Sequence, residues 1–261
     1  MFGTQWFETR ILSTLRGTAL PGTAQTFIGL YTTNPGNTGN AGSEISYSGY
    51  ARQVIEWSAP EVDADGNIFI QNTNSIIFPR SQEDAGEVRH LGILNAQPAG
   101  SGNMMLYGEW LLPLQVFTDN QPVVRPGEVR YTLEGDFSRW FKTQILNNLR
   151  GETIQGMTPV IALFDGDPQD SGVELIGGGY QRMSITFAAP SAQPEGYTRM
   201  QNSNDVIFPD PETPWGTWRF TALMSSVTGD LVDIFQNPRA ETINRQYIPR
   251  IAPFEYTMRL N

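Results

Sequence analysis

The sequence predicts a mainly β protein built from two tandem antiparallel β-sandwiches of the jelly-roll or immunoglobulin-like kind, each preceded by a short amphipathic helix. Three observations support this fold class. A long internal repeat divides the chain, apolar residues follow a helical spacing at the start of each repeat, and short β-prone runs follow. The 261 residues suit two ordinary domains, which commonly have about 100–150 residues each.

The repeat begins with residues 6–17 (WFETRILSTLRG), which recur as residues 140–151 (WFKTQILNNLRG). Similarity at a fixed period is the mark of a duplicated structural unit. Later matches keep the same order along the chain: 49–52 with 179–182, 71–72 with 201–202, 77–79 with 207–209, and 131–133 with 256–258. The sequence therefore predicts a first domain over residues 1–134 and a second over residues 135–261.

Apolar residues recur at every fourth position at the start of each repeat, as on one face of a helix. These residues are Phe7, Ile11 and Leu15 in the first repeat and Phe141, Ile145 and Leu149 in the second. So narrow an apolar stripe predicts that each helix packs on one surface only.

The expected helix ends follow from capping residues. Asp136 stands where an N-cap is expected for the second helix. Arg16-Gly17 and Arg150-Gly151 place a cation near the negative end of each helix dipole and a glycine just beyond it. Both helices should therefore stop at these positions.

Short β-prone runs separated by glycine and proline follow each helix. Residues 26–31, 52–57 and 67–70 are examples. Alternation of apolar and polar residues in such runs, with turns every ~8–12 residues, is typical of an antiparallel sandwich.

Charge and composition exclude several partners. The net charge of −10 repels a phosphate backbone, and no basic stretch with interleaved aromatic residues offsets it, so nucleic acid is not expected as a partner. The chain has no cysteine and therefore no disulfide or thiolate site. No apolar run reaches the ~18 residues that a membrane span needs.

No catalytic residue, metal ligand or cofactor site is predicted. His90 is the only histidine, which argues against a serine triad and against a zinc site, so we interpret it as structural. The acidic segments 63–67 and 165–170 lack the spacing of a calcium loop and are interpreted as hairpin turns. Residues 177–179 (GGG) precede a β-prone run rather than a helix, so we interpret them as a turn and not as a phosphate loop.

Two tryptophans are candidate partner contacts. Trp6 and Trp140 precede Phe7 and Phe141, and adjacent helical residues point about 100° apart. The phenylalanine can therefore face the core while the tryptophan faces a partner, although a core position for both rings is the alternative. Tryptophan is enriched among the residues that dominate protein interfaces.

Several segments resemble a family of tailed-bacteriophage tail-fibre-like virion proteins. In the first repeat they are 30–35 (LYTTNP), 42–45 (GSEI), 49–52 (GYAR) and 76–79 (IIFP). In the second they are 163–164 (LF), 172–174 (GVE), 178–182 (GGYQR) and 206–209 (VIFP). We take the tyrosine and arginine of the third motif as further candidate partner contacts, namely Tyr50, Arg52, Tyr180 and Arg182.

The resemblance implies a non-enzymatic structural protein of the virion, assembled in the host cytoplasm and present in many tail-associated copies as a fibre, adaptor, neck or baseplate part. Its expected partners are other virion proteins and copies of itself. A capsid decoration protein and a module that binds host-surface glycans are the alternatives, and a depolymerase is a third class. Because residues 34–40 are neutral and residues 165–170 are acidic, we expect the two repeats to contact different neighbours.

Overall fold

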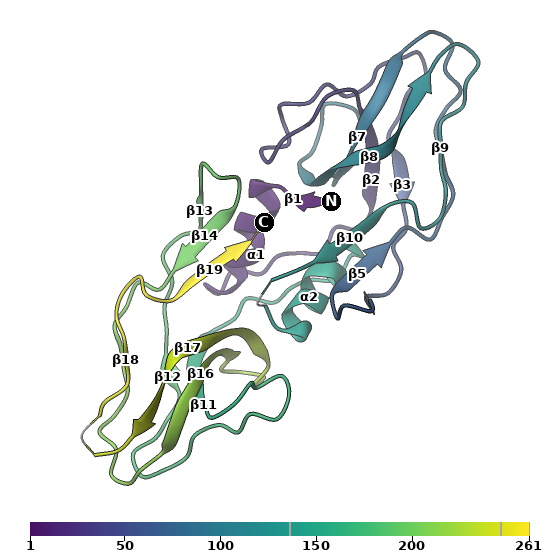
Figure 1. The fold of residues 1–261 in the computed structure, drawn as a ribbon. Coiled ribbons are helices and arrows are strands. Elements are labelled where there is room, and N and C mark those ends of the chain that lie inside the picture. The colour runs from purple at the N-terminus through teal and green to yellow at the C-terminus, as the bar shows by residue number, and fades with distance from the viewer. Residues whose placement is uncertain (136, 246, 261) are drawn as a thin grey trace.

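The computed structural model describes residues 1–135, 137–245 and 247–260. It is mainly β, with antiparallel sheets and two helices, which confirms the predicted fold class. The molecule is elongated and has two lobes, with the helices and both chain ends near the waist between them (Figure 1). We call residues 1–134 the first half and residues 135–261 the second half.

The first half contains one helix and ten of the strands. The helix α1 is Gln5–Thr14. The strands are β1 (Phe2–Gly3), β2 (Thr26–Tyr31), β3 (Gln53–Ile55), β4 (Glu61–Val62), β5 (Ile68–Gln71), β6 (Ile76–Ile77), β7 (Gly86–Leu94), β8 (Met104–Val116), β9 (Val123–Val124) and β10 (Arg130–Leu133). They form a large sheet in the order β1-β8-β7-β2-β3, a small sheet in the order β10-β5-β4, and the pair β6-β9.

The second half repeats this plan. The helix α2 is Arg139–Leu149. The strands are β11 (Pro159–Phe164), β12 (Met183–Ser184), β13 (Ser191–Ala192), β14 (Thr198–Gln201), β15 (Val206–Ile207), β16 (Gly216–Ser225), β17 (Leu231–Ile243), β18 (Arg250–Ile251) and β19 (Thr257–Leu260). Its large sheet has the order β12-β11-β16-β17, its small sheet the order β13-β14-β19, and its two-stranded ladder is β15-β18. Among the described residues, every one of these sheets takes its strands from one half only.

Each helix begins at a hydroxyl cap. The Thr4 Oγ1 accepts a hydrogen bond from the Phe7 N–H at 3.4 Å, and the Ser138 Oγ accepts one from the Phe141 N–H at 3.1 Å. Asp136, the expected cap, lies outside the described residues, and the capping role in α2 belongs to Ser138. Ser138 caps because its short side chain reaches back to the third N–H of the helix.

The helices end as expected from the glycines that follow them. Gly17 and Gly151 have φ values of +85° and +101°, a left-handed conformation that glycine adopts without steric cost. The chain can therefore leave the helix sharply in both halves.

Each helix packs on two surfaces, so the prediction of a single packing surface was wrong. α1 contacts β8 of its own half and β13 and β14 of the second half, while α2 contacts β17 of its own half and β5 of the first half. Figure 1 shows this exchange, with α1 beside the small sheet of the second half and α2 beside β5 and β10. The buried stripe is correspondingly wider than predicted, because Leu12 and Leu146 are also fully buried.

The halves meet through their backbones along what we call the seam, residues 14–23 and 148–157. Leu20 and Ile154, equivalent positions of the two repeats, exchange two backbone hydrogen bonds of 2.9 Å. A Cβ on Gly22 would collide with the carbonyl of Gly151, and a Cβ on Gly156 would collide with the carbonyl of Gly17. The contacts at the seam thus have approximate two-fold symmetry.

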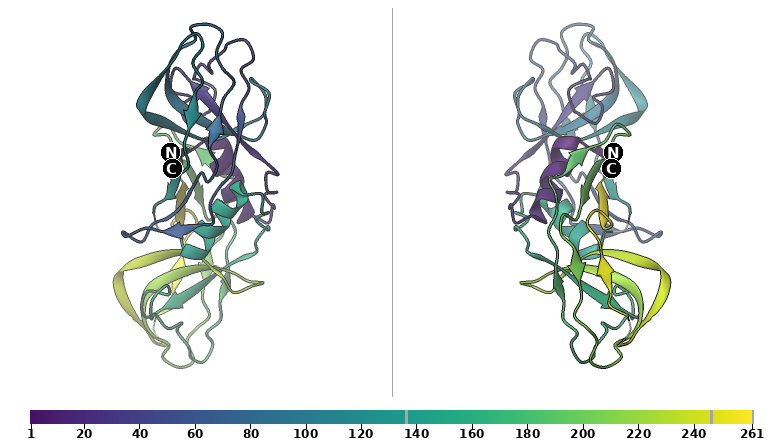
Figure 2. Two further views of the ribbon diagram at one scale, coloured as in Figure 1. Left: turned by 90° about the vertical axis from the view of Figure 1, so that its right-hand side faces the viewer. Right: turned by 90° about the vertical axis from the view of Figure 1, so that its left-hand side faces the viewer.

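One continuous cluster of buried residues spans both halves. The lobes project in opposite directions from this shared centre when the molecule is seen from either side (Figure 2). Because the helices contribute to the same cluster, damage to one helix should weaken the whole chain rather than one lobe.

We expect Leu149→Ala to lower the free energy of unfolding of the whole chain by ~2–5 kcal/mol, since a buried leucine is replaced by a cavity. Chemical denaturation followed by tryptophan fluorescence should show one transition, shifted to lower denaturant. Leu111→Ala, at an exposed position, is the control. Equal midpoints for the two variants would contradict burial of this helix in the common core.

Candidate interaction site

A cluster of three polar side chains stands on the large sheet of the first half. The Glu44 carboxylate accepts hydrogen bonds from Nε and Nη2 of Arg52, both at 2.7 Å, and from the Tyr50 hydroxyl at 3.1 Å. The Tyr50 oxygen in turn accepts the backbone N–H of Leu30 at 3.0 Å, and the Tyr50 ring stacks on Phe78. Burial and the nearby carboxylate raise the pKa of Tyr50 well above its usual range, so the hydroxyl stays a donor.

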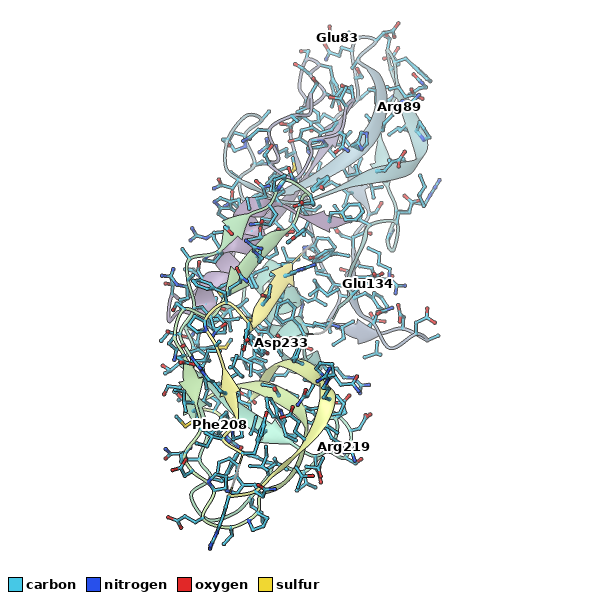
Figure 3. The ribbon with its side chains drawn as sticks, turned by 60° about the vertical axis from the view of Figure 1, so that its left-hand side comes forward. Glu83, Arg89, Glu134, Phe208, Arg219 and Asp233 are labelled. Atoms are coloured by element: carbon cyan, nitrogen blue, oxygen red, sulfur yellow. The ribbon has the colours of Figure 1, made fainter. Side chains whose placement is uncertain are left out.

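The same cluster recurs in the second half. Glu174 accepts Nε and Nη2 of Arg182 at 2.9 and 2.7 Å and the Tyr180 hydroxyl at 2.9 Å. The Tyr180 ring stacks on Phe208, which Figure 3 labels in the second lobe. We call each set a Tyr–Glu–Arg cluster.

The clusters explain why the repeated motifs are spaced as they are. The Gly-x-Glu, Gly-Tyr-x-Arg and Ile-Phe-Pro segments are separated in the sequence, yet their key side chains meet in one place in each half. An ion pair with two parallel hydrogen bonds also fixes the relative position of the two chain segments that carry it. The motif tyrosines and arginines therefore have a structural role.

The two clusters differ in how they are covered. In the first half the loop of residues 95–103 lies over the cluster, and Arg52 Nη1 donates to the carbonyls of Ala96 and Ser101, both at 2.8 Å. In the second half the corresponding connection is only residues 226–230. The Arg52 side chain is 2% exposed and the Arg182 side chain 39%. Within the described chain, Arg182 Nη1 has no acceptor at hydrogen-bond distance.

Two exposed apolar residues lie close in the sequence to Glu174 of the open cluster. Val173 and Ile176, on either side of Glu174 and Leu175 in the sequence, are 61% and 77% exposed. The first half has Ser43 and Ser46 at the matching positions. The second half thus has exposed aliphatic residues close to the cluster glutamate in the sequence, where the first half has serines.

We expect Arg52→Ala and Arg182→Ala to differ in stability although they remove the same motif residue. Loss of Arg52 leaves a largely buried carboxylate unpaired, which typically costs ~3–5 kcal/mol. Loss of Arg182 removes a solvent-exposed pair and should cost about 1 kcal/mol or less. Urea denaturation of both variants checks this, and similar costs would contradict the difference in burial.

The structure places both candidate tryptophans at the margin of the common core. Trp6 and Trp140 are partly buried and pack against it, whereas Phe7 and Phe141 are fully buried. The Arg10 guanidinium lies 5.0 Å from the centre of the Trp6 ring. Each tryptophan thus keeps one exposed part, and contact with a partner stays a prediction.

The residues considered for metal or catalytic chemistry lie apart. His90 pairs with Tyr31 and Glu109 in the sheet, and Phe220 occupies its position in the second half. The Asp63 carboxylate accepts two backbone N–H groups of its own turn and pairs with Arg130 at 2.7 Å. Within the described residues no three His, Cys, Asp or Glu side chains gather as a metal site would require.

Sequence reasoning missed a buried acid between the halves. Glu8 of α1 is 2% exposed and accepts a hydrogen bond at 2.6 Å from the hydroxyl of Thr198 on β14. Its other oxygen, Oε1, has no hydrogen-bond partner within the described chain. Desolvation by burial raises the pKa of Glu8 to about 7, which the hydrogen bond from Thr198 only partly offsets. The second repeat has Lys142 at the matching position, so comparison of the two repeats does not predict a buried acid here.

A cavity of about 860 Å³ lies between the halves and was not predicted either. Its walls come from the N-terminus, β10, β17 and β19, and include Glu134 and Asp233, which Figure 3 places at the waist. Because four segments distant in sequence line the cavity, no local sequence pattern predicts it.

None of the described helices is long and apolar enough to cross a membrane.

Comparison with known families accounts for the repeat. The family model described as podophage GP4 fiber I protein gp80 matches residues 4–132 and matches again over residues 136–258. A search of curated proteins finds no match. The two matches together cover nearly the whole chain, are consistent with a tandem duplication and confirm the resemblance to phage fibre-like proteins. The chain therefore belongs to the podophage GP4 fiber I protein family.

Proposed function

We propose that this protein is a non-enzymatic connector in the phage tail, present in several copies, whose two lobes contact different neighbouring virion proteins. Membership in a phage fibre family supports a tail-associated structural role. The connector role goes further and depends on the difference between the lobes.

The observation that carries this proposal is the difference in coverage between the two Tyr–Glu–Arg clusters. The first is covered by residues 95–103 of its own chain, whereas Arg182 in the second is 39% exposed, and Val173 and Ile176, close to Glu174 in the sequence, are exposed too. A duplicated unit that met identical partners would have no use for two different surfaces. The lobes also project away from each other, which suits a part that joins two neighbours.

Antibody labelling of purified particles, viewed by electron microscopy, tests the location. We expect label at the tail, in several copies per particle. Label on the capsid, or absence of the protein from particles, would contradict the proposal. Release of sugars from host-surface polysaccharide by the purified chain would contradict its non-enzymatic part.

A further inference from the structure

We propose that the open Tyr–Glu–Arg cluster of the second half receives a loop of a neighbouring virion protein, and that backbone carbonyls of that loop accept hydrogen bonds from Arg182. This inference rests on the proposed function, because the partner is a protein of the same particle.

The first half supplies the template for this contact. There the loop of residues 95–103 lies over an equivalent cluster and gives two carbonyl oxygens, from Ala96 and Ser101, to Arg52 Nη1. The Gln97 side chain adds a long contact of 3.5 Å to the Arg52 carbonyl. The same arginine–glutamate geometry in the second half leaves the matching donor, Arg182 Nη1, directed at no described protein acceptor.

Electrostatics restricts what can cover Arg182. A partner that buries the Arg182–Glu174 pair removes water from the unpaired N–H groups of Nη1, and this loss is unfavourable unless the partner brings acceptors. Neutral carbonyls meet the need without adding charge beside the Glu174 carboxylate. Because the Arg182–Glu174 pair is net neutral, a charged group from the partner would gain little net attraction and would itself have to lose its water.

Two residues close to Glu174 in the sequence add exposed apolar area to the second lobe. Val173 and Ile176 are 61% and 77% exposed, whereas the first half, whose cluster is already covered, has serines at both positions. Burial of exposed aliphatic side chains is a general source of association free energy. The exposed aliphatic residues thus occur in the repeat whose covering loop is short.

The loop of a second copy of this chain is a poor occupant. The carbonyls of Ala96 and Ser101 already accept hydrogen bonds from Arg52 of their own chain. Their transfer to another molecule would leave Arg52, which is 2% exposed, without these acceptors. We therefore assign the site to a different virion protein.

Arginine-selective modification with phenylglyoxal, read out by mass spectrometry, tests the contact in the intact protein. In the free chain we expect Arg182 to react and Arg52 to be protected. In purified particles we expect the reactivity of Arg182 to fall by roughly tenfold or more, since one charged hydrogen bond changes an equilibrium by about that factor. Unchanged reactivity of Arg182 in particles that contain the protein would overturn the inference but not the proposed function.

Addition of variants to particles that lack the protein gives an independent measurement. We expect Arg182→Ala to bind roughly tenfold less well than the wild type, provided that its unfolding midpoint stays near the wild-type value. Arg219→Ala is the control, because Arg219 is an exposed arginine elsewhere on the second lobe (Figure 3). Equal binding of both variants would overturn the inference, whereas failure of the wild-type chain to bind would overturn the proposed function as well.

Discussion

Residues 1–134 and residues 135–261, expressed separately, should each fail to give a stable folded monomer, and mixing them should restore the native structure. Each half alone loses the helix that packs on its small sheet and loses a surface on which its own helix packs. It also loses the backbone hydrogen bonds between Leu20 and Ile154. Exposed apolar surface of this kind promotes aggregation or self-association.

Size-exclusion chromatography and circular dichroism of each half and of the mixture provide the measurement. We expect a one-to-one complex that unfolds in a single transition. The matched control is the whole chain with a protease site between residues 134 and 135, which should stay assembled after cleavage. The predicted domain boundaries imply independent folding, and two monomeric halves that melt at the temperature of the whole chain would favour that prediction over the exchanged packing.

Glu8→Gln should stabilise the protein by about 3 kcal/mol above pH 7. The pKa of Glu8 is about 7 in the folded chain and 4.5 when unperturbed, and one pKa unit corresponds to about 1.4 kcal/mol. Below pH 4.5 both states bind the proton, so Glu8 contributes no pH dependence. Between pH 4.5 and 7 only the unfolded chain releases the proton, so stability falls as pH rises. Above pH 7 the penalty of a buried carboxylate is constant.

Urea denaturation of the wild type and of Glu8→Gln from pH 4 to pH 9 checks this result. The difference between the two proteins should grow from pH 4.5 to pH 7 and then level off. The nearby titratable groups Tyr107 and Tyr131 have pKa values raised above their usual range, chiefly by burial and also by the Glu8 carboxylate, so they stay neutral in this window. Glu61→Gln, at an exposed position on β4, is the control. Parallel curves for the wild type and Glu8→Gln would show that Glu8 is not buried between the halves.

The sequence determined the features that depend on local chemistry. The repeat, the two helices, their glycine ends and the β-rich remainder follow from residue spacing, because 3.6-residue periodicity and left-handed glycines act within a few residues. The recurring Glu, Tyr and Arg positions were also recognisable as a motif. Their meeting in one cluster was not, since it depends on how an irregular turn folds these few residues together, and such a turn has no regular spacing.

Only the tertiary structure decided what each element packs against. Apolar spacing shows that α1 has a face to bury, but the small sheets of both halves offer similar apolar surfaces, so the sequence cannot assign the helix to the more distant one. For the same reason the sequence does not distinguish Glu8 from an exposed helical glutamate. Its burial is evident only from the packing of α1 against β14. The difference between Arg52 and Arg182 likewise comes from residues 95–103, which act through the fold over more than 40 positions. Local chemistry fixed the elements, and long-range packing fixed which of their surfaces remain open to a partner.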